Sequence, residues 1–183
     1  MLTTSSRRTD TYNMSDLARK KAVQDKDYSD LWNRPGHLIR RLHQIHVAMF
    51  LEECREFNMT PVQFGVLTVL CQQGVSDIVS IGHGLGVDRI TVANVLRRLE
   101  RRKLVKRSLS SVDKRRKLAQ VTEQGRVLVD AVQPAMIKAQ RRFVYPLNSD
   151  EEATLDKLLS KLLLANNEAS RAPIKRGMRK SRI

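Results

Sequence analysis

The stretch DRITVANVLRRLERRKLVKRSLSSVDKRRKLAQVT, residues 88–122, predicts a helix that runs directly into a charged hairpin. The apolar residues of its first half have the spacing of one buried helical face: Val92, Val95, Leu96 and Leu99. Asp88 is placed to cap the helix, because a short side-chain acceptor satisfies backbone N–H groups that have no partner in the first turn. The rest of the chain is interpreted outward from this helix.

The opposite face of the same helix carries polar, basic and small apolar residues: Arg89, Ile90, Ala93, Asn94, Arg97 and Arg101. Such a face fits a major groove, where guanidinium groups pair with guanine, an amide with adenine, and apolar groups with thymine methyls. We expect Arg89, Asn94 and Arg97 to contact base edges, with Thr91 and Arg98 on the phosphates. The alternative is that these side chains contact phosphates alone or only solvent, since most protein–DNA hydrogen bonds go to the backbone.

The hairpin is predicted from two short apolar segments around a turn. Leu104-Val105 leads into Lys106-Arg107, the turn sequence SSVD follows, and the chain returns along LAQVT. The tip carries a run of four cations, Lys114, Arg115, Arg116 and Lys117. Two strands with a basic tip form a wing, and a helix followed by a wing is typical of DNA-binding proteins.

The charge of the chain favours a polyanionic partner. There are 34 Lys and Arg against 19 Asp and Glu, a net charge of +15 and a pI near 10.5. Residues 58–87 hold no Lys or Arg, while 88–103 hold six and 105–117 another six. A charged face that only meets solvent would explain either cluster alone, but their adjacency indicates nucleic acid first and an acidic membrane surface second.

Other classes of function find little support in the sequence. Cys54 and Cys71 form neither a disulfide framework nor a metal motif, and packing is the more ordinary role for both than redox sensing. His43 and His46 lie three residues apart on one predicted helix, so both could bind the same metal ion. No third ligand accompanies them, and we therefore expect no metal and no cofactor. The catalytic motifs of hydrolases, nucleotide-binding enzymes and zinc proteases are absent from the sequence, which predicts a protein that is not an enzyme. No apolar run resembles a signal peptide or reaches the roughly 20 residues of a spanning helix, which predicts a cytoplasmic protein with no membrane partner.

The segments before residue 88 predict a polar arm and then helices. Residues 1–30 form the arm, and a helix over 34–57 has two apolar faces, one more than packing within a single small domain needs. Thr60-Pro61-Val62-Gln63 is a capping box with proline in the first turn. Ser76 is expected to cap the next short helix, in which Gly82 and Gly84 should each cost about 1 kcal/mol relative to alanine.

The segments after the wing predict two more helices and a tail. A helix over 123–145 is followed by one with a ladder of leucines, again too apolar for an isolated helix: Leu155, Leu158, Leu159, Leu162 and Leu163. Residues 171–183 form a basic tail. The predicted fold is therefore mainly α with a small β-hairpin wing. A winged helix-turn-helix domain lies at 58–122, with dimerisation helices at 31–57 and 123–168 in a domain that spans 31–170.

The order and spacing of these segments resemble the MarR family of winged helix-turn-helix regulators. The matching sequences are TPVQFGVLTVL, GVDRITVANVLRRLERRKLVKR, SVDKRRKLAQVTEQG and YPLNSDEE, and RPGHLIRRLHQIH is similar to the branch that controls catabolism of aromatic compounds. The resemblance implies a homodimer on a double-stranded palindromic operator, with Arg115 in the minor groove, where negative potential concentrates. It also implies that Asp113 orients the wing through an ion pair, while Lys114 and Arg116 neutralise phosphates.

The same resemblance implies a small anionic effector. Candidate effector-binding residues are His37, Arg40, Arg41 and His46 on the first long helix and Phe64 on the next. Arginine can hold a carboxylate in a bidentate contact, so we expect an aromatic acid or its CoA thioester, although these side chains could equally form dimer contacts. The hypothesis is a ligand-responsive transcriptional regulator of the repressor type. The alternative is an architectural or RNA-binding protein that binds the charged backbone of a nucleic acid without recognising its base sequence.

Overall fold

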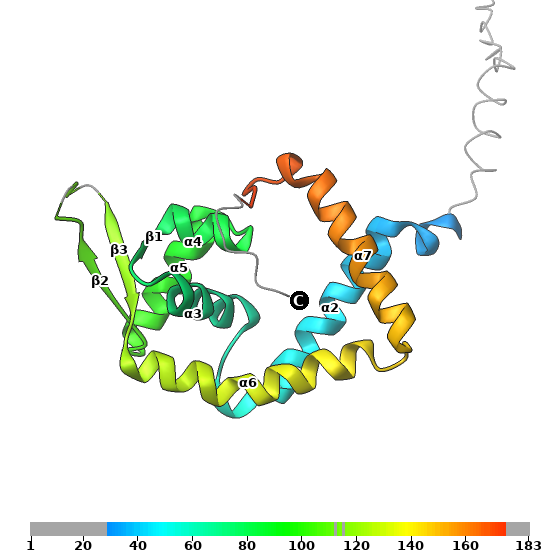
Figure 1. The fold of residues 1–183 in the computed structure, drawn as a ribbon, viewed down its shortest axis with the longest axis horizontal. Helices are drawn as coiled ribbons and strands as arrows, with labels where there is room; N and C mark the ends of the chain where they lie inside the picture. The colour runs from blue at the N-terminus through cyan, green and yellow to red at the C-terminus, as the bar shows by residue number, and fades with distance from the viewer. Residues whose placement is uncertain (1–28, 112, 115, 175–183) are drawn as a thin grey trace, which may run out of the picture. The chain divides into compact units, whose positions relative to one another are not determined.

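The computed structural model describes residues 29–174 with the exception of 112 and 115. The chain divides into two compact units, Met1–Leu42 and His43–Ile183. Its elements in chain order are η1 Ser29–Asn33, α2 Pro35–Glu53, η2 Arg55–Phe57, α3 Pro61–Gln73, β1 Ser76–Asp77, α4 Ile78–Leu85, α5 Arg89–Arg101, β2 Val105–Leu109, β3 Lys117–Val121, α6 Glu123–Val144, α7 Ser149–Ala165 and η3 Asn167–Ala169 (Figure 1). Residues 1–28 of the predicted arm 1–30 and residues 175–183 of the predicted tail lie outside the described residues.

The core of the larger unit is built from one face of each helix around α5. Most of its largest fully buried side chains come from α3, α4, α5 and α6: Val66, Leu67, Leu70, Ile81, Val92, Leu96, Leu99 and Val132. Cys54, between α2 and η2, joins them. All four residues predicted to line the inner face of α5 are buried. The 3.6-residue period of the sequence therefore identified the inward face of this helix correctly.

Side-chain caps fix where three of these helices begin. Thr60 and Gln63 form the predicted capping box, with Thr60 Oγ1 accepting from the Gln63 N–H at 3.3 Å and Gln63 Oε1 accepting from the Thr60 N–H at 3.1 Å. Asp88 caps α5 as predicted, accepting from the N–H groups of Ile90 at 3.0 Å and Thr91 at 2.9 Å. Helix α6 is capped by Thr122.

The cap predicted for α4 was wrong by one residue. Asp77, not Ser76, caps this helix, with its Oδ1 accepting from the Ser80 N–H at 2.8 Å. Ser76 is instead buried, and its hydroxyl lies 3.4 Å from Gln73 Oε1. The reason is that Ser76 and Asp77 form strand β1, which the sequence did not predict, so the helix begins only after the strand ends.

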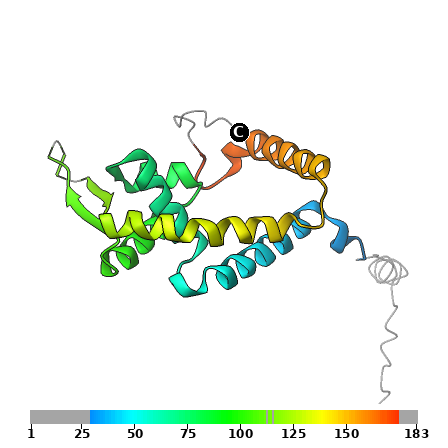
Figure 2. The same cartoon turned by 60° about the horizontal axis from the view of Figure 1, so that its bottom comes forward.

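The sheet is antiparallel, with the strand order β1-β3-β2. Strands β2 and β3 form the predicted wing, with Val105 opposite Val121 and Leu109 opposite Lys117. Strand β1 pairs with the other edge of β3, placing Ser76 opposite Ala119 and Asp77 opposite Leu118. The two wing strands extend beyond the helices (Figure 2), and β1, which leads directly into α4, pairs with residues 118 and 119 of β3.

Gly82 in α4 has a role in packing that its low helix propensity does not indicate. A Cβ atom at this position would lie 2.6 Å from the carbonyl oxygen of Val87, in the turn that leads to α5. The Gly82 carbonyl also accepts from the Val87 N–H at 3.0 Å and from the N–H of Gly86, which has a φ of 65°. Glycine thus allows α4 to approach this turn closely, a requirement that the predicted cost in helix propensity does not include.

Candidate nucleic-acid interface

The outer face of α5 presents the side chains that were predicted to contact DNA. Arg89, Asn94, Arg97 and Arg98 are all exposed. Ile90 is 76% exposed, so a large apolar side chain projects from the same surface. Guanidinium, amide and apolar groups therefore share one solvent-facing surface, and this combination matches the chemistry of base edges in a major groove.

Asp88 stabilises the first turn of α5 through a side-chain hydrogen bond as well as through the backbone N–H groups that it caps. The hydroxyl of Thr91 donates to Asp88 Oδ2 at 2.7 Å, so the half-buried Thr91 side chain is part of the cap. This bond, together with the backbone N–H bonds to the same carboxylate, lowers the pKa of Asp88. Asp88 is therefore ionised at neutral pH, and it orients the turn from which Arg89 projects.

Two ion pairs join the wing to the helices. Arg107 on β2 pairs with Glu100 near the end of α5, with Arg107 Nε 2.7 Å from Glu100 Oε2. The hydrogen bond from Arg107 lowers the pKa of the Glu100 carboxyl. At the base of the turn, Arg116 pairs with Asp77, whose side chain is only 12% exposed.

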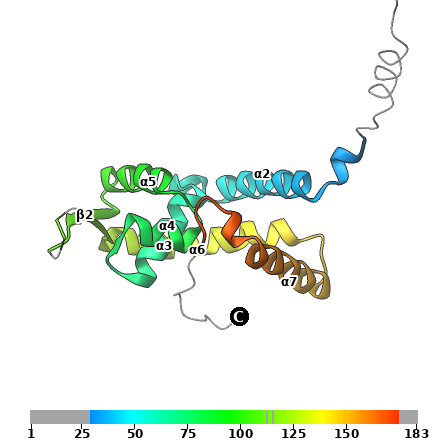
Figure 3. The ribbon, with the colours of Figure 1, turned by 90° about the horizontal axis from the view of Figure 1, so that it is seen from above.

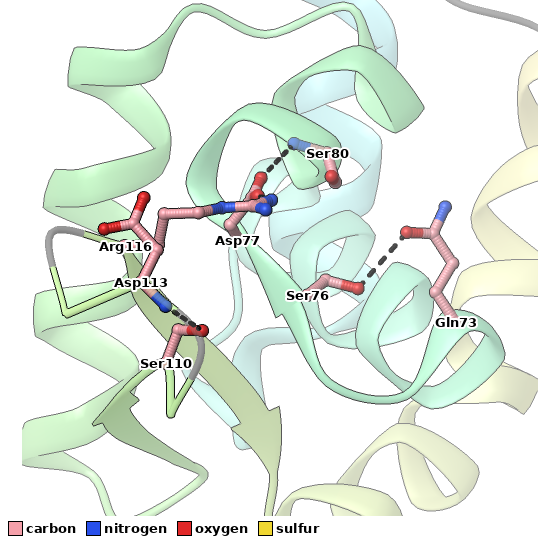
Figure 4. A network of polar contacts seen from close by, with 7 residues as sticks. All are labelled: Gln73, Ser76, Asp77, Ser80, Ser110, Asp113 and Arg116. Atoms are coloured by element: carbon pink, nitrogen blue, oxygen red, sulfur yellow. Dashed lines mark hydrogen bonds and ion pairs between the residues drawn. The ribbon is translucent and has the colours of Figure 1, made fainter.

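Asp77 is shared between α4 and the wing (Figure 4). One of its oxygens caps α4 at Ser80 and the other accepts from Arg116, 39 residues later in the sequence. Partial burial acts to raise the pKa of Asp77, but the bonds from Ser80 and Arg116 outweigh it, so the pKa is lowered. Arg116 was predicted only as a phosphate contact, and no local sequence pattern connects it with Asp77.

The wing tip itself is described in part. Lys114 is exposed, and Arg115 lies outside the described residues. The Asp113 N–H donates to Ser110 Oγ at 3.2 Å, and the Asp113 carbonyl accepts from the Arg116 N–H at 2.9 Å. The hydrogen bond and charge of Asp77 raise the pKa of Arg116, and the charge of Asp113 acts in the same direction. Its role in orienting the wing stays a prediction.

Comparison with known proteins agrees with this arrangement. Residues 59–117 match the MarR family. The structure of BpsR from Bordetella bronchiseptica, described as having its DNA binding regulated by 6-hydroxynicotinic acid, is 34% identical, with a TM-score of 0.68 over 72% of this chain and 94% of that one. The chain belongs to the MarR family. Its predicted fold class, mainly α with a β-hairpin wing, is confirmed.

Two further relatives of this MarR-family chain extend the comparison. The HTH-type transcriptional repressor NicR of Pseudomonas putida is 29% identical over 148 residues, which cover 81% of this chain and 94% of NicR. A mutant of MarR from E. coli in complex with operator DNA is 26% identical, with a TM-score of 0.69 over 75% of this chain and 99% of that one. The protein is accordingly a transcriptional regulator, and NicR is named as a repressor rather than as an enzyme.

The predicted effector-binding residues of this MarR-family protein fall in both compact units. In Met1–Leu42, Arg40 and Arg41 are exposed on α2, and the half-buried His37 ring packs edge-on against Trp32 with ring centroids 5.1 Å apart. In His43–Ile183, the ring of Phe64 lies 6.1 Å from that of Phe50, as part of the core boundary.

His46 is the effector candidate with the most distinctive surroundings. Its ring packs edge-on against Phe143 of α6 at 5.4 Å, and its Nε2 lies 2.9 Å from Nε2 of Gln140. Partial burial, followed by the charge of His43, lowers the pKa of His46. The imidazole is therefore neutral at pH 7, when it can both donate and accept hydrogen bonds.

The two cysteines resemble packing residues more than reactive thiols. Cys54 is fully buried and Cys71 half-buried, and burial raises the pKa of both. Across residues 29–174, with 112 and 115 left aside, no three His, Cys, Asp or Glu side chains gather as metal ligands would. Over the same residues, every helix is too short or too polar to cross a membrane.

Proposed function

We propose that this MarR-family regulator is a homodimeric repressor that binds a palindromic DNA operator and is released by an aromatic acid or its CoA thioester. The observation that carries the proposal is the outer face of α5, where Arg89, Asn94 and Arg97 are exposed beside a basic wing. In a two-fold dimer, the two α5 helices would enter major grooves about 34 Å apart. Thr91 and Arg98 would contact the flanking phosphates.

The wing completes the proposed DNA contact. Lys114 and Arg116 would neutralise phosphates, and Arg115 would enter the minor groove, oriented by Asp113. Arg115→Ala should therefore weaken operator binding more than the matched control Lys106→Ala, which removes a cation from strand β2 of the same hairpin. Equal losses in a titration at fixed salt would contradict the minor-groove assignment.

Dimerisation is supported by apolar surface on the last long helix. Leucines of α7 are exposed in the single chain, from 39% at Leu159 to 66% at Leu163, and none of the residues of this helix is buried. A row of exposed leucines of this kind is typical of an interface. We propose that segments 31–57 and 123–168 form the dimer and that 58–122 binds DNA. Light scattering should give twice the chain mass of 21.0 kDa.

Operator binding is tested by selection from a random pool of duplex DNA. The proposal expects a two-fold symmetric sequence to be enriched and to be bound in preference to its scrambled form. With about 6–10 phosphate contacts, affinity should fall roughly 10³–10⁵-fold between 50 and 200 mM salt, while the preference persists. Failure to enrich any sequence, with equal binding of all duplexes, would favour the architectural or RNA-binding alternative.

The effector proposal is supported by a relative and by charge. BpsR, at 34% identity, is described as regulated by an aromatic acid. In this chain, Arg40 or Arg41 could pair with a carboxylate, while His37, His46 and Phe64 supply aromatic and hydrogen-bonding groups. The test is the operator affinity in the presence of hydroxynicotinic and benzoic acids and their CoA thioesters. If none of these compounds lowers the affinity, the effector proposal fails while operator binding stands.

A further inference from the structure

Ile90 is the one large apolar side chain of α5 that faces solvent, in a helix that the structure describes throughout. It is 76% exposed, whereas the other large apolar side chains of this helix are buried on one face: Val92, Val95, Leu96 and Leu99. With about 100° of rotation per residue, Ile90 points about 180° away from the middle of that face. Figure 3 shows α5 at the edge of the larger unit, with α3 and α4 packed against one side of it. Packing within the chain therefore does not account for an isoleucine here.

The side chains around Ile90 are polar and basic. Asn94 and Arg97 follow it by four and seven residues on the same stripe of the helix, Arg89 precedes it, and all three are exposed. A protein interface would surround an exposed isoleucine with further apolar side chains, whereas this stripe carries positive charge. The surface fits a polyanion that also presents an apolar group. Duplex DNA is such a partner, because the C5-methyl group of thymine projects into the major groove.

The backbone of Ile90 is held in position in the free protein. Its N–H donates to Asp88 Oδ1 at 3.0 Å, and the Thr91 hydroxyl donates to the other oxygen of the same carboxylate at 2.7 Å. A β-branched side chain on a helix also has one strongly preferred χ1 rotamer. Placing Ile90 against a base should therefore cost little conformational entropy.

We propose that Ile90 is a specificity-determining residue that contacts a thymine methyl group in each operator half-site. The inference rests on the proposed operator binding and adds one base to those assigned to Arg89, Asn94 and Arg97. Four residues of helix rise by about 6 Å, and bases on one strand are about 3.4 Å apart. The thymine should therefore lie within about two base pairs of the base that Asn94 contacts. RNA would not supply this contact, because uracil lacks the methyl group and the major groove of an RNA helix does not admit side chains.

The first test removes the methyl group and nothing else. Each thymine of the operator enriched from the random pool is replaced in turn, in both half-sites, by deoxyuridine, which keeps the hydrogen bonds of the base pair. At one thymine per half-site, wild-type affinity should fall about 4-fold for each methyl group lost, or roughly 15-fold for the symmetric pair, the worth of buried methyl groups. If no replacement lowers the affinity, or if the operator has no thymine in its half-sites, the proposal is overturned.

The second test repeats the replacement with variants of the protein. Because Ile90 is exposed, Ile90→Ala leaves no cavity, and it should keep the Tm of the wild type while losing affinity for the thymine operator. The deoxyuridine replacement should then cause no further loss, since the partner of the methyl group is gone. Ile90→Val keeps a branched apolar side chain and should stay sensitive to the methyl group.

Val127→Ala is the matched control for these variants. It removes a branched apolar side chain that is 60% exposed on α6, and it should leave both the operator affinity and the deoxyuridine effect unchanged. A deoxyuridine effect of the same size in the wild type and in Ile90→Ala would assign the methyl contact to another residue and overturn the proposal.

Selection from the random pool separates the two proposals. With Ile90→Ala, the preference for thymine should be lost at one position of each half-site, while the preferences at the other positions persist. If the wild type enriches no sequence, operator binding itself is wrong and the thymine contact fails with it. If the wild type enriches an operator and Ile90→Ala enriches the same thymine, operator binding stands and only the role of Ile90 is wrong.

Discussion

Replacing Gly82 by alanine tests whether the packing of α4 against the turn before α5 has been interpreted correctly. Helix propensity alone predicts that Gly82→Ala stabilises the protein by about 1 kcal/mol. In the structure, however, the new Cβ would lie 2.6 Å from the Val87 carbonyl oxygen, a backbone atom that cannot rotate away. Overpacking of a well-packed site costs typically 1–3 kcal/mol, and a contact this short belongs at about the upper end. The expected net loss is about 2 kcal/mol.

The loss should be visible in both thermal unfolding and DNA binding. For a chain of this size, about 2 kcal/mol corresponds to a fall in Tm of roughly 4–8 °C. Movement of Val87 would also displace the cap at Asp88, so operator affinity should fall. Gly36→Ala is the matched control, because a Cβ at Gly36 meets nothing within 4 Å. A Gly82→Ala variant with a Tm equal to or above that of the wild type would refute the close approach.

Three further outcomes follow from the contacts of single side chains. Asp77→Ser keeps an acceptor for the α4 cap but removes the partner of Arg116, so it should weaken operator binding. Arg116→Gln should weaken it further, because it also removes the proposed phosphate contact, and equal losses with no added loss in the double variant would contradict that contact. The Glu53 carboxyl has its pKa lowered by the hydrogen bond from Lys138, so its contribution to stability is present at neutral pH and is lost as the pH falls through the folded-state pKa. The difference in Tm between wild type and Glu53→Gln should accordingly be present near pH 7 and shrink as the pH falls below the ordinary carboxyl range; a difference independent of pH would exclude the ion pair as its cause. The Cys54 thiol, which is buried and has a raised pKa, should react with iodoacetamide far more slowly in the native protein than in denaturant, and equal rates would contradict its burial.

The parts of the fold that were predicted from sequence depend on local patterns. The inward face of α5 follows from the spacing of Val92, Val95, Leu96 and Leu99, and its start from a single acceptor at Asp88. The capping box at Thr60 and the wing strands likewise depend on residues close in sequence. The family was identified from the same segments, because a recognition helix and wing constrain consecutive residues.

The parts that were missed depend on contacts between distant residues. Strand β1 has only two residues, and its pairing with β3 decides that Asp77 rather than Ser76 caps α4. The partner of Arg116 lies 39 residues earlier in the sequence. The packing role of Gly82 was also missed, because it depends on the position of the Val87 carbonyl.

The ratio of operator affinity to scrambled-DNA affinity in Asn94→Ala and Arg97→Ala is the most direct measurement of whether α5 contacts base edges. A bidentate contact to a base is worth about 1–3 kcal/mol of discrimination, so each variant should lower the ratio roughly 5- to 150-fold. Lys106→Ala is the control, and it should lower both affinities together and leave the ratio unchanged. If Asn94→Ala and Arg97→Ala also leave the ratio unchanged, α5 does not determine sequence preference and the account of this interface is wrong.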